Sequence, residues 1–313
     1  MYGIVLTVPL PDLPDWLPAW CLDQLGAEPV GVLFQAQQVS MVFGLRLAGG
    51  TDVVVKARAD DGRAASCVAA QARLADRGFP CARPLTPVTS LGSLAVHAEE
   101  FRPGGEVLEG DSPDVAVCYA QLFGRLMSEL TDVTVAPPLP NPPWVRWDHS
   151  CAGLWPAIDF LDSRDQSAVP AWVADAAERA RRRILAAGLP SVLGHADFEA
   201  QNLRWRGREV WAVHDWDSLA WQPEAALAGA ASGSFASAGP PMLAPVESSE
   251  AFLATYQNIR GRLFTAAERE IAWAASVWMA AYNAREEALH GSTTVGRDTL
   301  RAQAAERLRR ASA

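Results

Sequence analysis

Four polar side chains in the second half of the chain have types and spacing that suit proton transfer and cation binding. Asp197 follows His195 by two positions, and Asn202 comes five residues after Asp197. A carboxylate held in such a loop can accept the proton of a hydroxyl group. Carboxylate and amide oxygens are the ligands that a hard divalent cation prefers. We predict that Asp197 accepts a proton, that Asn202 and Asp215 bind a divalent cation, and that His195 only orients the loop.

The segment between Asn202 and Asp215 has the pattern of a β-hairpin. Two short apolar stretches, residues 203–205 and 210–213, lie on either side of the turn sequence Arg206-Gly207-Arg208. A hairpin returns the chain to its starting point. We therefore expect the two proposed metal ligands to lie beside each other.

The chain contains a single lysine among 27 basic residues, and this Lys56 closes the apolar run Val53–Val55. A compact ammonium group fits between phosphate oxygens in a way that a planar guanidinium does not. A lysine at the end of such a strand holds nucleotide phosphates in kinases. Taken alone, a stray surface lysine explains the position equally well, but with the downstream motif we predict that Lys56 binds phosphate.

Together, the Val-Val-Val-Lys56, His195-Ala-Asp197, Asn202 and Asp215-Trp-Asp217 motifs resemble the aminoglycoside phosphotransferase and choline kinase-like family of small-molecule kinases. The resemblance implies an α+β, bilobal protein-kinase-like fold. A small β-rich N-lobe, residues 1–102, would bind nucleotide, and a larger, mainly helical C-lobe, residues 103–313, would carry catalysis and the acceptor. It also implies ATP and Mg²⁺, with transfer of the γ-phosphoryl group to a hydroxyl of a small molecule.

The expected N-lobe elements place further candidate nucleotide ligands. Ser40 lies in the turn between the first two strands, where a phosphate-covering loop would lie. Glu99, Glu100 and Phe101 take the position of the hinge between the lobes, where backbone groups would meet an adenine ring. The strands and the first helix are expected over Val30–Phe34, Met41–Leu47, Thr51–Lys56, Leu94–Phe101 and Pro14–Leu25.

The helix that follows Lys56 lacks the glutamate with which the family pairs this lysine. The predicted helix, Gly62–Arg77, has no acidic residue in its first three turns. Cys67 stands where the glutamate is expected, and Gln71 lies one turn further along the same face. We expect Lys56 to be held by Gln71, by a backbone carbonyl or by Asp215.

Sequence patterns also predict the principal C-lobe elements. Helices are expected over Asp114–Leu130, Ala171–Ala187 and Ala266–Leu289. The last of these carries three large aromatic residues, Trp273, Trp278 and Tyr282, which belong to the core or line a cleft. Residues Gly229–Pro245, rich in Gly, Ala, Ser and Pro, suggest a flexible loop near the acceptor. The arginine-rich residues Arg301–Ala313 suggest an exposed helix with a frayed end.

Asp217 and Glu224 are candidate ligands for the acceptor because they follow the metal motif. They would favour a cationic compound such as an aminoglycoside, a basic peptide antibiotic or an amino alcohol; an ordinary acidic surface explains them equally well. One alternative is a kinase with a neutral sugar or amino-acid acceptor. Another is a nucleotide-binding pseudokinase with a regulatory role, which the missing helix glutamate motivates and the intact Asp197 argues against.

Composition limits the other partners. A net charge of −9 argues against general binding of nucleic acid, which needs a basic footprint. The five cysteines show no disulfide or metal spacing, as expected of reduced thiols. Met1–Leu10 lacks the basic region of a signal peptide, and no apolar stretch is long enough to span a membrane. We predict a cytoplasmic protein without a nucleic-acid or membrane partner; the acceptor and the oligomeric state stay open.

Overall fold

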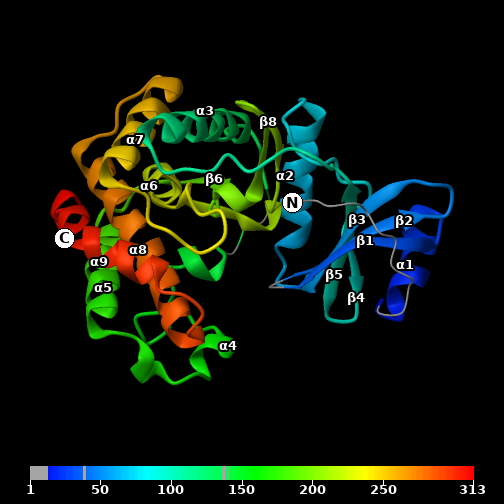
Figure 1. The fold of residues 1–313 in the computed structure, drawn as a ribbon, viewed down its shortest axis with the longest axis horizontal. Coiled ribbons are helices and arrows are strands. Elements are labelled where there is room, and N and C mark those ends of the chain that lie inside the picture. Colours follow the sequence, from blue (N-terminus) through cyan, green and yellow to red (C-terminus); the bar gives the residue numbers. More distant parts are fainter. Residues whose placement is uncertain (1–12, 38–39, 136–138, 140) are drawn as a thin grey trace. The chain divides into compact units, whose positions relative to one another are not determined.

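The computed structural model describes residues 13–37, 40–135, 139 and 141–313, which form two compact units. The first unit holds the described residues of Met1–Gly105, Thr134–Pro137 and Trp211–Asp217. The second holds those of Glu106–Val133, Pro138–Val210 and Ser218–Ala313. The predicted α+β fold, with a small β-rich part and a larger helical part, is confirmed (Figure 1). The segment Met1–Leu10 lies outside the described residues, and the predicted lobe boundary after residue 102 stays a prediction.

A five-stranded antiparallel sheet forms the centre of the first unit, in the order β1-β2-β3-β5-β4 (Figure 1). Its strands are β1 (Pro29–Gln37), β2 (Met41–Leu47), β3 (Asp52–Ala59), β4 (Thr89–Leu91) and β5 (Leu94–Glu100). Side chains alternate between the faces of a strand, so Val53 and Val55 of β3 face away from Lys56. This apolar face packs against α1 (Trp16–Leu25) and buries Leu17 and Trp20.

The opposite face of β3 carries the charged side chains Lys56 and Arg58. The strand continues three residues beyond Lys56, so this lysine lies inside the strand and not at its end. The following helix, α2 (Ala64–Asp76), places Gln71 against this face. Gly78, with φ of +76°, lies just beyond the helix in the left-handed conformation that glycine adopts readily.

Helices dominate the second unit. They are α3 (Pro113–Leu130), α4 (Asp159–Asp162), α5 (Ala171–Ala186), α6 (Glu224–Ser234), α7 (Val246–Arg260), α8 (Ala266–His290) and α9 (Val295–Arg310). Helix α8 contacts α5, α6 and α9, and its Trp273, Trp278 and Tyr282 are buried, so these aromatic residues belong to the core. Two short strand pairs complete the fold: β6 (Ser191–His195) with β9 (Leu219–Pro223), and β7 (Leu203–Arg206) with β8 (Glu209–Val213). The latter is the predicted hairpin.

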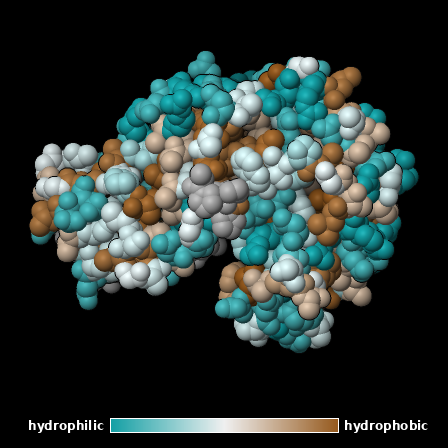
Figure 2. Space-filling model, turned by 180° about the vertical axis from the view of Figure 1, so that it is seen from behind, coloured by the Kyte–Doolittle hydropathy of each residue, from teal (hydrophilic) through white to brown (hydrophobic). Residues whose placement is uncertain are grey.

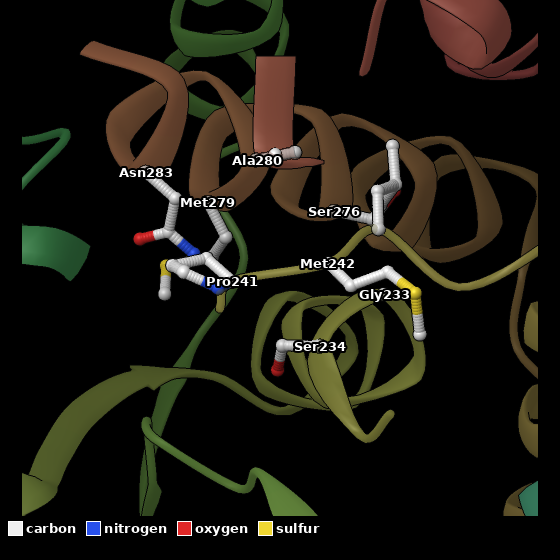
Figure 3. A pocket seen from close by; sticks show the side chains of 10 residues that line it. Gly233, Ser234, Pro241, Met242, Ser276, Met279, Ala280 and Asn283 are labelled. Carbon is white, nitrogen blue, oxygen red and sulfur yellow. The ribbon is translucent and has the colours of Figure 1, made fainter. Parts of the chain in front are cut away.

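The flexible loop predicted over Gly229–Pro245 is wrong in its first part, because residues 229–234 belong to α6. A Cβ atom at Gly229 would lie 2.0 Å from the carbonyl oxygen of Ala272 in α8. Gly233 likewise lies against Ser276 of α8, beside a cavity of about 10 Å³ that has room for at most one water molecule (Figure 3). The small residues therefore permit close helix packing.

The exposed C-terminal helix predicted over Arg301–Ala313 is also partly wrong. Arg307 of α9 is fully buried, and its guanidinium donates to the carbonyl oxygen of Ala244 and to the hydroxyls of Ser249 and Ser276. Burial lowers the pKa of Arg307 to about 9. This side chain ties α9 to the core of the second unit.

The surface mixes polar and apolar residues, as Figure 2 shows for one face. The most exposed large apolar side chains come from different elements, among them Leu22 of α1, Val30 of β1 and Leu185 of α5. None of the helices in the described parts of the chain is long and apolar enough to cross a lipid bilayer.

Candidate active site

Lys56 forms a buried ion pair with Glu99 of β5. Lys56 Nζ lies 2.9 Å from Glu99 Oε1, and the two side chains are 13% and 3% exposed. The Gln71 amide nitrogen donates to the other carboxylate oxygen at 2.8 Å and to the carbonyl oxygen of Ala82 at 2.9 Å. Gln71 therefore contacts the carboxylate and not the lysine. The expectation that Gln71, a backbone carbonyl or Asp215 holds Lys56 is corrected: its partner is Glu99.

The two partners keep each other charged despite their burial. Burial lowers the pKa of Lys56, but the carboxylates of Glu99, Asp217 and Asp215 outweigh this effect and raise the pKa above its ordinary value. Burial alone would raise the pKa of Glu99. The charge of Lys56 and the Gln71 hydrogen bond outweigh this effect, so the pKa lies below its ordinary value. At neutral pH the site thus holds an ammonium beside a carboxylate.

The predicted hinge residues Glu99 and Glu100 are the last two residues of β5. The backbone of Glu99 pairs with Val54 of β3 on one side and with Pro84 on the other. The backbone N–H of Glu100 donates to the carbonyl oxygen of Arg83 at 2.8 Å. These pairings place both residues at the edge of β5, and contact of their backbone with an adenine ring stays a prediction.

Phe101 and Ser40 remain predicted nucleotide ligands. Phe101 is the first residue beyond β5, and its ring centroid lies 6.0 Å from that of Phe34 in β1. Ser40 immediately precedes β2, and residues 38–39 lie outside the described part.

Asp215 adopts an unusual backbone conformation. Its φ is +58°, a left-handed value that is uncommon for residues other than glycine. The next residue, Trp216, is 2% exposed; its indole donates to the carbonyl oxygen of Val213 at 3.0 Å, and its ring packs edge-on against Phe79. The buried tryptophan holds the turn in place. Residues held in such conformations are concentrated at functional sites, which supports the assignment of Asp215 as a metal ligand.

Two arginines of the first unit hold Asp217. Its carboxylate pairs with Arg58 at 3.1 Å, and both side chains are buried or nearly so. Its carbonyl oxygen accepts a hydrogen bond from Arg63 at 2.8 Å. These contacts anchor the segment that carries Asp215, and a role of Asp217 in binding the acceptor stays a prediction.

The proposed proton acceptor lies in the second unit, after β6. The backbone N–H of Asp197 donates to His195 Nδ1 at 3.2 Å, and His195 is 1% exposed, which agrees with the expected orienting role. A short 3-10 turn, Ala200–Asn202, returns the chain to Asp197. The Asn202 amide nitrogen donates to the Asp197 carboxylate at 2.9 Å and to its carbonyl oxygen at 3.0 Å. The structure thus brings these two predicted residues together.

Each predicted metal ligand carries an atom that suits magnesium. Both Asn202 contacts use the amide nitrogen, so its amide oxygen is the atom suited to a cation, and Asp215, in the first unit, carries a carboxylate. Mg²⁺ typically binds one or two carboxylates and completes its shell with water and substrate phosphates. Among the described residues, no group of three or more His, Cys, Asp or Glu side chains could hold a metal ion.

Glu224 has a structural role that the sequence did not reveal. Glu224 is the first residue of α6. Its carboxylate accepts hydrogen bonds from Tyr256 at 2.6 Å, Arg260 at 2.8 Å and Arg262 at 2.7 Å. Burial raises the pKa of Glu224, but these hydrogen bonds outweigh it and hold the pKa below its ordinary value. This carboxylate joins α6 to α7, and its predicted role in acceptor binding stays a prediction.

The sequence model of the phosphotransferase enzyme family matches residues 45–246, which include Lys56, Asp197, Asn202 and Asp215. This range is more than half of the chain. The chain belongs to the phosphotransferase enzyme family. No curated protein sequence matches this phosphotransferase.

Solved structures share the fold of this phosphotransferase. Amicoumacin kinase hAmiN, in complex with AMP-PNP and Ca²⁺, aligns with a TM-score of 0.60 and 13% identity, over 89% of this chain and 88% of that one. Spectinomycin phosphotransferase APH(9)-Ia, with ADP and spectinomycin, gives 0.56 and 12%, over 97% and 94%. A thermostable mutant of aminoglycoside phosphotransferase APH(4)-Ia, with ADP and hygromycin B, gives 0.54 and 14%, over 96% and 100%. At sequence identities this low, the likeness shows that the fold is shared and no more.

Proposed function

We propose that this phosphotransferase moves the γ-phosphoryl group of ATP to a hydroxyl group of a small molecule, with magnesium as the cofactor. The observation that carries the proposal is the hydrogen-bonded pair of Asp197 and Asn202. A pure binding module has no need of a proton acceptor fixed in this way. The solved relatives that hold ADP or an ATP analogue together with a small molecule support the same reading.

Each residue has a defined task in this proposal. Lys56, kept charged by Glu99, steadies the donor phosphates. Asp197 orients the acceptor hydroxyl and takes its proton, and Asn202 keeps this carboxylate in place. Asn202 and Asp215 would hold magnesium, which supplies positive charge to the phosphate oxygens when bound. Positioning and charge neutralisation provide most of the acceleration, because phosphoryl transfer needs little covalent help from the protein.

The pseudokinase alternative loses its motivation. It rested on the missing helix glutamate, and Glu99 supplies the lysine with a buried carboxylate from another element. A kinase for cationic acceptors and a kinase for neutral acceptors both fit the described site, since Asp217 and Glu224 are occupied by arginines.

An acceptor panel tests the proposal. Purified protein with magnesium and ATP should consume ATP when given the right aminoglycoside, amino alcohol, sugar or amino acid, and mass spectrometry should find the phosphorylated acceptor. The matched control is Asp197→Asn, whose amide oxygen can still accept the Asn202 hydrogen bond but cannot take a proton. It should bind magnesium-ATP normally and turn over about 10²- to 10⁴-fold more slowly. Near-normal turnover in this variant would remove Asp197 from its role.

A further inference from the structure

We propose that Glu99 is the positioning residue that takes the place of the absent helix glutamate and fixes the Lys56 ammonium for the donor phosphates. This inference rests on the proposed function, because it concerns the same phosphate-binding lysine. It assigns the task to a strand residue in the sheet, whereas the family assigns it to the following helix.

The register of the sheet places the two side chains within reach. In the antiparallel pair of β3 and β5, Lys56 lies opposite His97 and Val54 lies opposite Glu99. Lys56 and Glu99 are therefore diagonal neighbours on one face, a separation that long side chains span. The backbone hydrogen bonds of two adjacent strands thus fix the carboxylate relative to the lysine. Both members of the ion pair therefore come from the sheet.

Helix α2 supports the carboxylate with neutral groups. Gln71 donates to the second oxygen of Glu99 and thereby orients it toward Lys56. Cys67, at the position where the family glutamate is expected, is buried, and burial raises the pKa of its thiol above the ordinary value. A neutral thiol cannot act as a counter-ion, so the charge that balances Lys56 comes from β5.

Stability alone does not account for this pair. Replacing a buried ion pair by well-packed apolar residues is often neutral or stabilising, because desolvation of the two charges offsets their attraction. The chain also has arginine at every other basic position, yet keeps its only lysine here. A compact ammonium with a fixed carboxylate suits contact with phosphate.

A double-mutant cycle tests whether Glu99 acts through Lys56. The variants are Glu99→Gln, Lys56→Met and the double variant, with kcat and KM for ATP measured alongside magnesium-ATP affinity by calorimetry. Glu99→Gln should lower kcat/KM for ATP by about 10²-fold, the scale for loss of one positioned electrostatic group. In the Lys56→Met background the same substitution should cost nothing further.

The matched control is Asp52→Asn. Asp52, the first residue of β3 and four residues before Lys56, pairs with Arg46 of β2 at 2.8 Å. It should leave the kinetics unchanged. Glu99→Asp, which keeps the charge but shortens the side chain, should retain the fold and recover part of the lost activity.

These experiments distinguish a failure of the role inferred for Glu99 from a failure of the proposed function. Wild-type activity together with Glu99→Gln kinetics within twofold of wild type would overturn this inference alone. The same holds if the losses from Glu99→Gln and Lys56→Met multiply in the double variant, or if Glu99→Asp is no more active than Glu99→Gln. A wild-type protein that neither binds magnesium-ATP nor transfers phosphate would overturn the proposed function and this inference with it.

Discussion

Replacing Lys56 by methionine should destabilise the protein, and replacing both members of the ion pair should restore most of the loss. Methionine keeps the apolar stem of the side chain and removes the ammonium. Glu99, which is 3% exposed, would then keep the Gln71 amide but lose its counter-ion. The penalty arises from a carboxylate left charged in a buried site and not from lost packing.

Two estimates bound the loss in free energy of unfolding that Lys56→Met causes. Removing one partner of a buried ion pair typically costs about 3–5 kcal/mol. The carboxyl can escape part of this cost by taking up a proton: from an ordinary pKa of 4.5, protonation at pH 7 costs about 3.4 kcal/mol. We therefore expect Lys56→Met to lower the free energy of unfolding by about 3 kcal/mol at pH 7. The double variant Lys56→Met with Glu99→Gln should lie within about 1 kcal/mol of wild type, since a neutral amide is left without any buried charge.

The pH dependence has a definite sign. The wild-type fold lowers the pKa of Glu99 below its ordinary value of 4.5. The ion pair therefore contributes its full stabilisation of the folded protein above pH 4.5. This contribution is lost as the pH falls through the pKa that Glu99 has in the folded protein. Without the ammonium, the folded protein takes up the proton at a higher pH than the unfolded chain. The stability difference between wild type and Lys56→Met should therefore shrink as the pH falls from 7 to 4.5.

Urea unfolding at several pH values, followed by tryptophan fluorescence and circular dichroism, measures these differences. Asp52→Asn again serves as the control, because its partly exposed ion pair should be worth at most about 1 kcal/mol. The reasoning would be refuted if Lys56→Met were as stable as wild type at pH 7. It would also be refuted if the double variant were no more stable than the single one.

Two further perturbations test the metal site and the α6–α7 contact. Asp215→Ala should weaken ATP binding only when magnesium is present, because it removes a carboxylate ligand; calorimetry with and without magnesium would contradict the assignment if both proteins gave equal affinities in both conditions. Glu224→Gln should lower the free energy of unfolding by about 1–3 kcal/mol at pH 7, and the difference should vanish as the pH falls below 4.5, since the fold lowers the pKa of Glu224. A difference that stays constant down to pH 3 would show that the carboxylate charge is not responsible.

Elements with local signals were predictable from the sequence. Helices α1 and α2 end where Gly26 and Gly78 follow, both with positive φ, and the hairpin of β7 and β8 turns at Gly207. Helix α6 was missed because its composition has two explanations. Glycine and serine favour loops locally, but Gly229 is required by the backbone of Ala272, which is distant in sequence.

In the candidate site, too, local contacts were predictable and contacts between distant segments were not. Asp197 and Asn202 were predictable because they belong to one short loop, where spacing determines contact. The partner of Lys56 was not, because Glu99 reaches it only through the register of two strands, and register is not visible in a single sequence. Order along the chain instead suggested that Glu99 belonged to the hinge. Arg58 and Asp217 meet for an equally non-local reason.

Ion pairs with arginine weaken the argument that an acidic composition implies a cationic acceptor. A net charge of −9 suggests a surplus of carboxylates, but three acidic residues that follow the metal motif are paired with arginine. Asp217 pairs with Arg58, Glu224 with two arginines of α7 and the following turn, and Glu250 with Arg310. Carboxylates balanced in this way offer little attraction to a cation. Neutral sugars and amino acids therefore belong in the first acceptor panel beside the aminoglycosides and amino alcohols.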